Sequence, residues 1–317
     1  MTDAQPRVLV VGEALVDVVP DRDGNPQDLP GGSPANVAIT LGRLGHDVHL
    51  VTVLGDDARG RLVRSWLEAS RVTVLAQQPG SGRTSSAAVT LDESGAATYD
   101  FDLAWDLGEV PRQDCDVFHV GSIATVLAPG ADVVLEAVRS HHGRALVSLD
   151  PNARPALTPD HPAAVARVEE LVGLSGVVKV SDEDLEWLFP DVDPVATATR
   201  WATRGPGLVV VTRGGDGAVA VRPDGTTLEV PGVPVVVADT VGAGDTFSGV
   251  LIDTLLALGV SGPGGADALR ALSDRDVLDV VTTAAIGAAV TVSRPGADPP
   301  DRAELTAALG GAGAREG

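Results

Sequence analysis

A short segment near residue 240 places three small residues directly before a carboxylate. It reads Asp239-Thr240-Val241-Gly242-Ala243-Gly244-Asp245, follows the apolar, strand-like run Val233–Ala238, and opens a predicted helix. The small side chains of Gly242, Ala243 and Gly244 let the backbone turn tightly and point its N–H groups outward. Because the positive end of the helix dipole adds to these N–H groups, the segment is a candidate anion site that needs no lysine.

Asp245 needs a separate explanation, since a carboxylate beside an anion site repels phosphate. One interpretation is a general base, which accepts the proton of a hydroxyl as that hydroxyl attacks the phosphate. The other interpretation is a helix cap that takes no part in chemistry. The local pattern favours neither of the two.

A second group of polar residues lies near the amino end. The run Gly31-Gly32-Ser33-Pro34-Ala35-Asn36 enters a predicted helix, its glycines allow close approach to a ligand, and Asn36 can donate and accept hydrogen bonds. On its own, the same run is also an ordinary helix entry. Asp17 shares a strand face with Leu15 and Val19, which is an odd place for a carboxylate unless that face borders a polar cleft. A carboxylate there would suit paired hydroxyls of a sugar.

Two further polar clusters follow predicted strands: Asp150-Pro151-Asn152-Ala153-Arg154-Pro155 and Ser181-Asp182-Glu183-Asp184. Ligands bind at the carboxyl ends of the strands in α/β sheets, so both clusters are candidates for a site. The second cluster is also typical of a helix start, with Ser181 as the N-cap and acids in the first turn. Metal binding and helix capping therefore both stay open for Glu183 and Asp184.

The balance of charge excludes several classes of function. The 317 residues carry 44 Asp and Glu against 23 Lys and Arg, a net charge of −21, and Lys179 is the single lysine. Nucleic acids and anionic membranes attract clustered positive charge, so we expect neither as a partner. Lys179 lies in a strand-like run without a glycine-rich turn, which excludes a lysine-based phosphate loop. We interpret it as a partly buried residue at a strand end, with no part in the chemistry.

The cysteine content and the hydropathy pattern limit the cellular compartments in which we expect the protein. A single cysteine, Cys115, excludes an intrachain disulfide and a multi-cysteine zinc site. The amino end does not resemble a secretory signal, and the uncharged stretch Val280–Ser293 is shorter than the roughly 20 residues of a membrane span. We therefore expect a cytoplasmic protein.

Short β-branched runs alternate with longer helical patterns, which predicts a doubly wound α/β sheet with helices on both faces. The predicted parallel strands are Val8–Val11, Val48–Leu54, Val117–Val120, Ala145–Leu149, Val177–Val180 and Leu208–Thr212. A hairpin is expected at Ala218–Val221 and Thr226–Val230. The predicted helices are Ala35–Leu44, Arg59–Ala69, Asp132–Ser140, Ala163–Leu171, Asp182–Leu188, Val195–Thr203, Gly244–Leu258, Asp274–Val292 and Ala303–Leu309.

Two stretches depart from this alternation. Ala14–Val19 continues from the first strand and then runs into the turn-rich Asp21–Pro30. The runs Thr84–Leu91 and Thr98–Leu103 are strand-like, with side chains that alternate between two faces. Such half-exposed strands are typical of a small antiparallel sheet outside the main one. That sheet is a candidate lid, which would shield reacting groups from water. An edge extension and a dimer surface are the other interpretations.

Over nearly its whole length the chain resembles the ribokinase/PfkB family of carbohydrate kinases. The run from Gly31 through Gly42-Arg43-Leu44-Gly45 is similar to the amino-terminal signature of that family, and Gly55-Asp56-Asp57 matches the step that follows it. The segment Asp239–Asp245 is similar to the carboxy-terminal signature. The resemblance implies a three-layer α/β/α core of residues 1–13, 32–83 and 106–317. It also implies a small β-sheet lid of residues 14–31 and 84–105.

The resemblance further implies a role for each candidate residue. Asp245 would be the base on the acceptor hydroxyl, and the amides of Gly242, Ala243 and Gly244 would bind the transferring γ-phosphoryl group of ATP. The sugar would contact Asp17, Gly31, Gly32, Asn36 and Arg154, and ATP would lie beside Thr212, Gly214 and Gly217. The family's magnesium-associated motif Asn-x-x-Glu is replaced here by Ser181-Asp182-Glu183-Asp184. Either Glu183 or Asp184 would therefore order the water shell of Mg²⁺. A monovalent cation (K⁺) would lie near Asp239 and Arg294-Pro295-Gly296.

Within the family, the segments around Glu13 and Asn152 are most similar to fructokinases. Arg154 does not separate these from 2-keto-3-deoxygluconate kinases, because an arginine there can approach phosphate oxygens or a substrate carboxylate. The expectation is an ATP-dependent sugar kinase with fructose as acceptor, and a homodimer through the lid. The alternatives are another sugar kinase of this family and, in a different class, a non-catalytic regulator that binds sugar or nucleotide.

Overall fold

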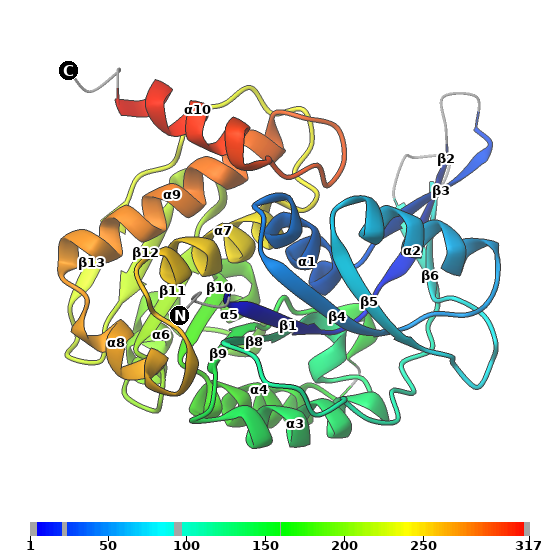
Figure 1. The fold of residues 1–317 in the computed structure, drawn as a ribbon, viewed down its shortest axis with the longest axis horizontal. Helices are drawn as coiled ribbons and strands as arrows, with labels where there is room; N and C mark the ends of the chain where they lie inside the picture. Colours follow the sequence, from blue (N-terminus) through cyan, green and yellow to red (C-terminus); the bar gives the residue numbers. More distant parts are fainter. Residues whose placement is uncertain (1–4, 21–23, 92–96, 159, 314–317) are drawn as a thin grey trace.

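The computed structural model describes residues 5–20, 24–91, 97–158 and 160–313. Nine strands form the main sheet, in the order β13-β12-β11-β10-β9-β8-β1-β4-β5, and four form a second sheet, in the order β3-β2-β6-β7 (Figure 1). The strands of the main sheet are β1 (Arg7–Val11), β4 (Asp47–Val53), β5 (Val72–Gln77), β8 (Val117–Gly121), β9 (Leu146–Asp150), β10 (Val177–Ser181), β11 (Leu208–Thr212), β12 (Ala218–Val221) and β13 (Thr227–Val230).

Seven adjacent strands, from β5 to β11, run parallel, and the β12–β13 hairpin adds two antiparallel strands at one edge. Parallel strands buried on both faces are rich in β-branched residues, as they are here. In β1, Val8 and Val10 belong to one hydrophobic cluster and Leu9 and Val11 to the other, as the period of two requires.

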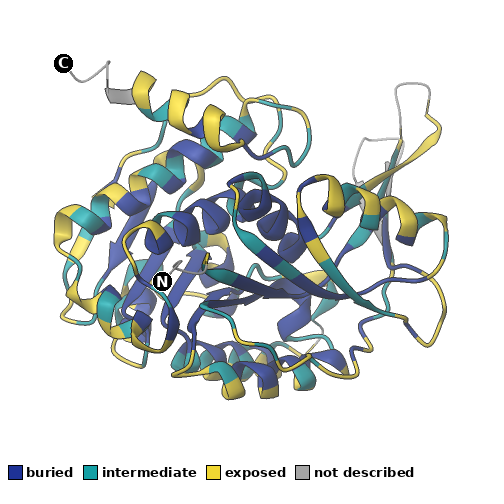
Figure 2. Ribbon diagram, in the orientation of Figure 1, coloured by how far each residue is buried: buried dark blue, intermediate teal, exposed yellow. Residues whose placement is uncertain are grey.

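Helices cover both faces of this sheet. The helices α1 (Ser33–Arg43), α2 (Ala58–Ala69), α7 (Ala243–Ala257), α8 (Gly265–Ala271), α9 (Asp274–Val292) and α10 (Arg302–Gly313) contribute to one cluster. The helices α3 (Gly130–His141), α4 (His161–Leu174), α5 (Asp182–Leu188) and α6 (Pro194–Ala202) contribute to the other. The sheet between them is buried, and the outer helix faces are exposed (Figure 2). The predicted doubly wound three-layer fold is therefore confirmed.

The second sheet stands apart from the main one, beside α2 (Figure 1). Its strands are β2 (Leu15–Pro20), β3 (Pro26–Gly31), β6 (Ser86–Leu91) and β7 (Ala97–Asp102). Two antiparallel pairs, β2–β3 and β6–β7, are joined by the parallel pairing of β2 with β6. Residues 21–23 and 92–96 of the predicted lid lie outside the described residues.

Two local expectations are wrong. The part of the turn-rich Asp21–Pro30 from Pro26 onward forms β3, because β2 supplies a strand with which it pairs. Val233–Ala238 is not a strand, since the β12–β13 hairpin already closes that edge of the sheet. Instead, the N–H groups of Ala238 and Asp239 donate to the carbonyl of Val292 in α9.

Among the described residues, no single helix is both long and apolar enough to cross a bilayer. The helix α7 passes the test of length and composition only together with the segment Gly262–Ala271, to which it is bent by 104°.

Core packing makes a prediction about stability. Leu50 in β4 is fully buried, whereas Leu62 in α2 is 38% exposed. Leu50→Ala should lower the free energy of unfolding by about 2–5 kcal/mol, because it removes buried methyl groups and leaves a cavity. Leu62→Ala should change it by no more than about 0.5 kcal/mol. Urea unfolding of both variants measures the difference, and equal losses would contradict the assignment of the core.

Candidate active site

The candidate residues gather where the parallel strands end. Glu13 follows β1, Asp150 ends β9 and Thr212 ends β11. The helices α1 and α7 also begin at this edge of the sheet, after the Gly31-Gly32 step and after Gly242. The carboxyl edge of a doubly wound sheet is where such folds bind ligands, so the topology brings distant sequence segments to one place.

Asp245 lies between the first turns of α1 and α7 and is 7% exposed. Ser33 donates a hydrogen bond through Oγ to Oδ1 of Asp245 (2.6 Å), and Asn36 donates through Nδ2 to Oδ2 (2.7 Å). Burial raises the pKa of Asp245, and these two hydrogen bonds oppose the rise because they favour the ionised form. The residue at the N-cap of α7 is Gly242, so the carboxyl group is held by α1 rather than by its own helix.

The turn that opens α7 presents backbone amides. Gly242 has φ = 76°, a left-handed conformation that glycine adopts without strain, and a Cβ there would lie 2.6 Å from that of Ala297. The Ala243 N–H donates to the Thr240 carbonyl (3.3 Å). For the N–H groups of Gly242 and Gly244, no acceptor is found in the part of the chain that the structure describes. Of the three amides predicted to bind the anion, those of Gly242 and Gly244 are therefore free, while that of Ala243 is already engaged.

Lys179 lies within β10 rather than at its end, and only 6% of it is exposed. Because Val178 and Val180 face the α3–α6 layer, the alternation of the strand turns Lys179 toward α7 on the opposite face. Its Nζ donates to Oδ2 of Asp150 (3.0 Å) and would lie 2.9 Å from a Cβ placed on Gly244. The interpretation of Lys179 as a partly buried strand-end residue, remote from the chemistry, is therefore wrong in both position and burial.

Asp150 connects Lys179 to α7. The same Oδ2 that accepts from Lys179 also accepts from Oγ of Ser248 (3.0 Å). Burial works against the charge on Lys179, but Asp150 and Asp184 more than offset it and raise the pKa of the ammonium group. Oδ1 of Asp150 is buried and has no partner among the described residues. The ammonium group therefore stays charged beside the amide turn.

A second cluster of carboxyl groups lies where the small sheet joins the main one. Oδ2 of Asp17, on β2, would lie 2.4 Å from a Cβ placed on Gly31, so this carboxyl group packs against the glycine step. Burial raises its pKa, and the charge of Arg154 opposes the rise. Burial also raises the pKa of Glu13 to about 7, although a hydrogen bond from Ser122 and the charge of Arg154 both act to lower it. Sequence reasoning missed Glu13 as a site residue, although a charged residue directly after a buried strand was the available signal.

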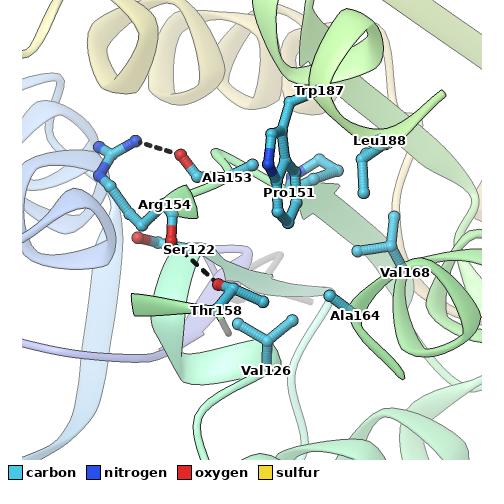
Figure 3. A pocket seen from close by; sticks show the side chains of 10 residues that line it. All are labelled: Ser122, Val126, Pro151, Ala153, Arg154, Thr158, Ala164, Val168, Trp187 and Leu188. Carbon is cyan, nitrogen blue, oxygen red and sulfur yellow. Dashed lines mark hydrogen bonds between the residues drawn. The ribbon is translucent and has the colours of Figure 1, made fainter. Parts of the chain in front are cut away.

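Arg154 follows β9 and turns away from a small apolar pocket. Figure 3 shows its guanidinium group directed away from Val168, Trp187 and Leu188, with one dashed hydrogen bond to the Ala153 carbonyl. The group also donates to Oδ1 of Asn152 (2.6 Å). The pocket itself holds about 10 Å³, enough for a water molecule and too little for a sugar.

A larger cavity of about 260 Å³ lies beside the amide turn. The three predicted nucleotide residues, Thr212, Gly214 and Gly217, all line it, as do Ala243 and Gly244. The remaining lining residues are small or apolar: Gly215, Gly232, Val233, Val235, Val237, Thr240, Phe247, Ala285, Ala288, Ala289 and Val292. The structure thus places the nucleotide candidates and the anion turn around one cavity.

The candidate metal residues do not form a closed cage. In the described ranges, no group of three or more His, Cys, Asp or Glu side chains is arranged to hold a metal ion. Asp184 accepts from the N–H groups of Ala153 (2.8 Å) and Ser181 (3.3 Å), and with Ser181 it forms a capping box. Glu183 is exposed. The capping interpretation of this cluster is therefore confirmed for Ser181 and Asp184.

Several known proteins are similar to this chain. A fructokinase of Rhizobium leguminosarum bv. trifolii is 36% identical over 266 residues, which cover 78% of this chain and 79% of the relative. A fructokinase of Xylella fastidiosa solved with bound ATP aligns with a TM-score of 0.88 at 27% identity, over 98% of this chain and 100% of that one. A double mutant of the Vibrio cholerae fructokinase, solved with fructose, ADP and a potassium ion, aligns with a TM-score of 0.78 at 27% identity, over 98% and 99%.

The family model of the pfkB carbohydrate kinases matches residues 5–303, which is nearly the whole chain. This match agrees with the fold, with the two signature segments at α1 and α7, and with the carboxylate that lies between them. The resemblance predicted from the sequence is therefore confirmed, and the chain belongs to the pfkB family of carbohydrate kinases.

Proposed function

We propose that this carbohydrate kinase transfers the γ-phosphoryl group of ATP to a hydroxyl of fructose. The observation that carries the proposal is the buried Asp245 carboxylate, which lies at the start of the same helix whose N-terminal amides are free to bind phosphate. Fructokinases at 36% and 34% identity support fructose as the acceptor. The fructokinase solved with bound ATP supports the donor.

In the proposed reaction, the acceptor oxygen lies against Asp245 and in line with the bond between the γ-phosphorus and the β-phosphate. As the new P–O bond forms and the old one breaks, the hydroxyl proton passes to Asp245 and ADP leaves. Asp245 must therefore be ionised before the step. The hydrogen bonds from Ser33 and Asn36 support that state within a buried site.

Buried acceptors without partners support a sugar-binding space next to Asp245. Among the described residues, Oδ1 of Asn36 and Oε2 of Glu13 are buried and accept no hydrogen bond, so sugar hydroxyls would satisfy them. Asp17 and Arg154 would complete the contacts, with the Gly31-Gly32 step allowing close approach. Since two carboxyl groups face this space, a neutral sugar fits it better than an acidic one such as 2-keto-3-deoxygluconate.

The nucleotide would occupy the 260 Å³ cavity, with its base against the apolar lining and its phosphates toward Gly242 and Gly244. Magnesium takes oxygen ligands, keeps several waters and binds through one or two carboxylates plus substrate phosphates. Burial raises the pKa of Asp184, and the negative charge of Asp150 raises it further, so the two carboxyl groups lie close together. The site therefore fits such an ion. We assign Asp184 to the metal's water shell; the ion would neutralise charge on the phosphates.

A monovalent cation would lie where two loops meet. Asp239 accepts hydrogen bonds from the N–H groups of Val241 (3.0 Å) and Gly296 (2.8 Å), which ties the α7 turn to the segment after α9. The potassium ion in a related fructokinase supports this assignment.

We further propose that the small sheet is a lid which pairs two copies of the chain. We propose a cytoplasmic setting, where ATP is available.

The first prediction about the proposed function concerns the base. Asp245→Asn should lower kcat by roughly 10²–10⁴, the scale of a lost general base, while the fold is kept because the amide has nearly the same shape. A coupled assay for ADP release measures it. Asp267→Asn, on an exposed side chain of α8, is the matched control and should keep wild-type activity. Turnover by the Asp245 variant within a few-fold of wild type would refute the assignment.

The second prediction concerns pH. Because the folded-state pKa of Glu13, about 7, lies above its ordinary value of 4.5, the fold favours the protonated acid. This contribution to stability is complete below about pH 4.5 and is lost as the pH rises through about 7. Between about pH 5 and pH 8, wild type should lose up to about 3 kcal/mol relative to Glu13→Gln, which stays neutral. Urea unfolding at the two pH values measures this, and parallel curves would contradict it.

The third prediction concerns the acceptor. In the assay with ATP, fructose should give the highest kcat/KM in a panel that includes ribose, tagatose, 2-keto-3-deoxygluconate and nucleosides. The acidic sugar should be the poorest of the monosaccharides, because it meets Glu13 and Asp17. A preference for 2-keto-3-deoxygluconate would overturn the choice of fructose. Binding of ATP and sugar without any phosphorylation would instead favour a non-catalytic regulator.

A further inference from the structure

The Lys179 ammonium group is in an unusual electrostatic position. It is buried next to Gly244, in the first turn of α7, where the helix dipole is positive. A cation is destabilised at the N-terminal end of a helix and is expensive to bury. Asp150, 3.0 Å away, and the charges of Asp184 and Asp245 offset the cost of burial, but these carboxylates do not explain why the cation lies beside the N-terminal end of a helix.

The hydrogen bonds of Lys179 are incomplete. An ammonium group has three N–H donors, and the structure gives one hydrogen bond, to Oδ2 of Asp150. The other two donors have no acceptor in the described ranges. Buried donors of this kind are normally satisfied, so they indicate an acceptor that binds between Lys179 and the turn.

The charge of the surroundings identifies that acceptor. The 260 Å³ cavity, which Ala243 and Gly244 of the turn line, has no charged residue in its lining, although ATP would bring several negative charges there. Nζ of Lys179 would lie 2.9 Å from a Cβ placed on Gly244, and Gly244 itself lines this cavity. An anionic group bound at Gly244 would meet both the amide and the ammonium group.

We propose that Lys179 binds the transferring γ-phosphoryl group of ATP together with the Gly244 amide, and that Asp150 is the positioning residue that holds Lys179. The proposal rests on the kinase function proposed above. During transfer, the acceptor oxygen bonds to the γ-phosphorus, the bond to the ADP oxygen breaks and the proton goes to Asp245. Lys179 keeps its three protons and balances the charge on the non-bridging phosphoryl oxygens.

Lys179→Met tests the role in turnover. We expect kcat to fall by about 10²–10³, the usual loss when one preorganised donor to the reacting group is removed. The KM for fructose should change by no more than about threefold, because the sugar lies on the side of Glu13 and Asp17. An unchanged kcat would overturn the proposal.

The double variant Lys179→Met with Asp150→Asn separates catalysis from charge balance. The single variant leaves Asp150 as a buried, unpaired carboxylate, which destabilises the protein; the double variant removes both charges. We expect the double variant to recover much of the thermal stability but none of the lost kcat. If kcat returned to within about tenfold of wild type, Lys179 would only neutralise Asp150 and the proposal would be wrong.

A binding measurement stays informative even if the protein phosphorylates no sugar. Lys179→Met should weaken a non-hydrolysable ATP analogue by about tenfold or more and leave the affinity for ADP within about twofold, since only the former has a γ-phosphoryl group. Calorimetric titration of both nucleotides measures this. Equal losses for the two nucleotides would overturn the assignment to the γ-phosphoryl group, whereas failure of the kinase proposal alone would leave the selective loss in place.

Discussion

The site depends on one buried carboxylate that two helices share. Asp245 belongs to α7, but both of its oxygens are held by side chains of α1, 209 and 212 residues away in sequence. Burying an unpaired carboxylate is costly, and the hydrogen bonds from Ser33 and Asn36 offset much of that cost. The same two bonds fix the first turns of α1 and α7 against each other. This contact therefore sets the distance between the amide turn of α7 and the glycine step before α1. That glycine step continues from β3 of the small sheet.

Around this contact, acidic groups and positively polarised groups occupy different parts of the site. Glu13 and Asp17 lie near the small sheet, and the charge of Arg154 opposes the rise in pKa that burial causes in both carboxyl groups. Lys179 lies at the amide turn, which lines the 260 Å³ cavity proposed for the nucleotide. A chain with a net charge of −21 repels a polyanion at long range, so binding of ATP requires a local reversal of sign. In the proposed binding mode, two free amides, a helix end and one buried ammonium group provide that reversal.

The sequence predicted the parts of this arrangement that are local. Alternation of β-branched runs with helical runs predicted the parallel strands, and the small residues before Asp245 predicted the turn. Contacts between distant segments were not predictable. The proline-containing segment Pro26–Gly31 is a strand only because β2 lies beside it, and Val233–Ala238 is not one because the hairpin occupies the edge. Lys179 was misread for the same reason, since its strand could be recognised but not the helix that packs against its face.

The central claim is that Asp245, the amide turn and the acceptor hydroxyl meet at one point. A crystal structure with fructose and a non-hydrolysable ATP analogue tests this most directly. The account predicts one fructose hydroxyl within about 2.6–3.2 Å of an Asp245 oxygen, with the γ-phosphate bound by the amides of Gly242 and Gly244. A closed complex in which no sugar hydroxyl contacts Asp245, or in which the γ-phosphate lies away from the turn, would contradict it.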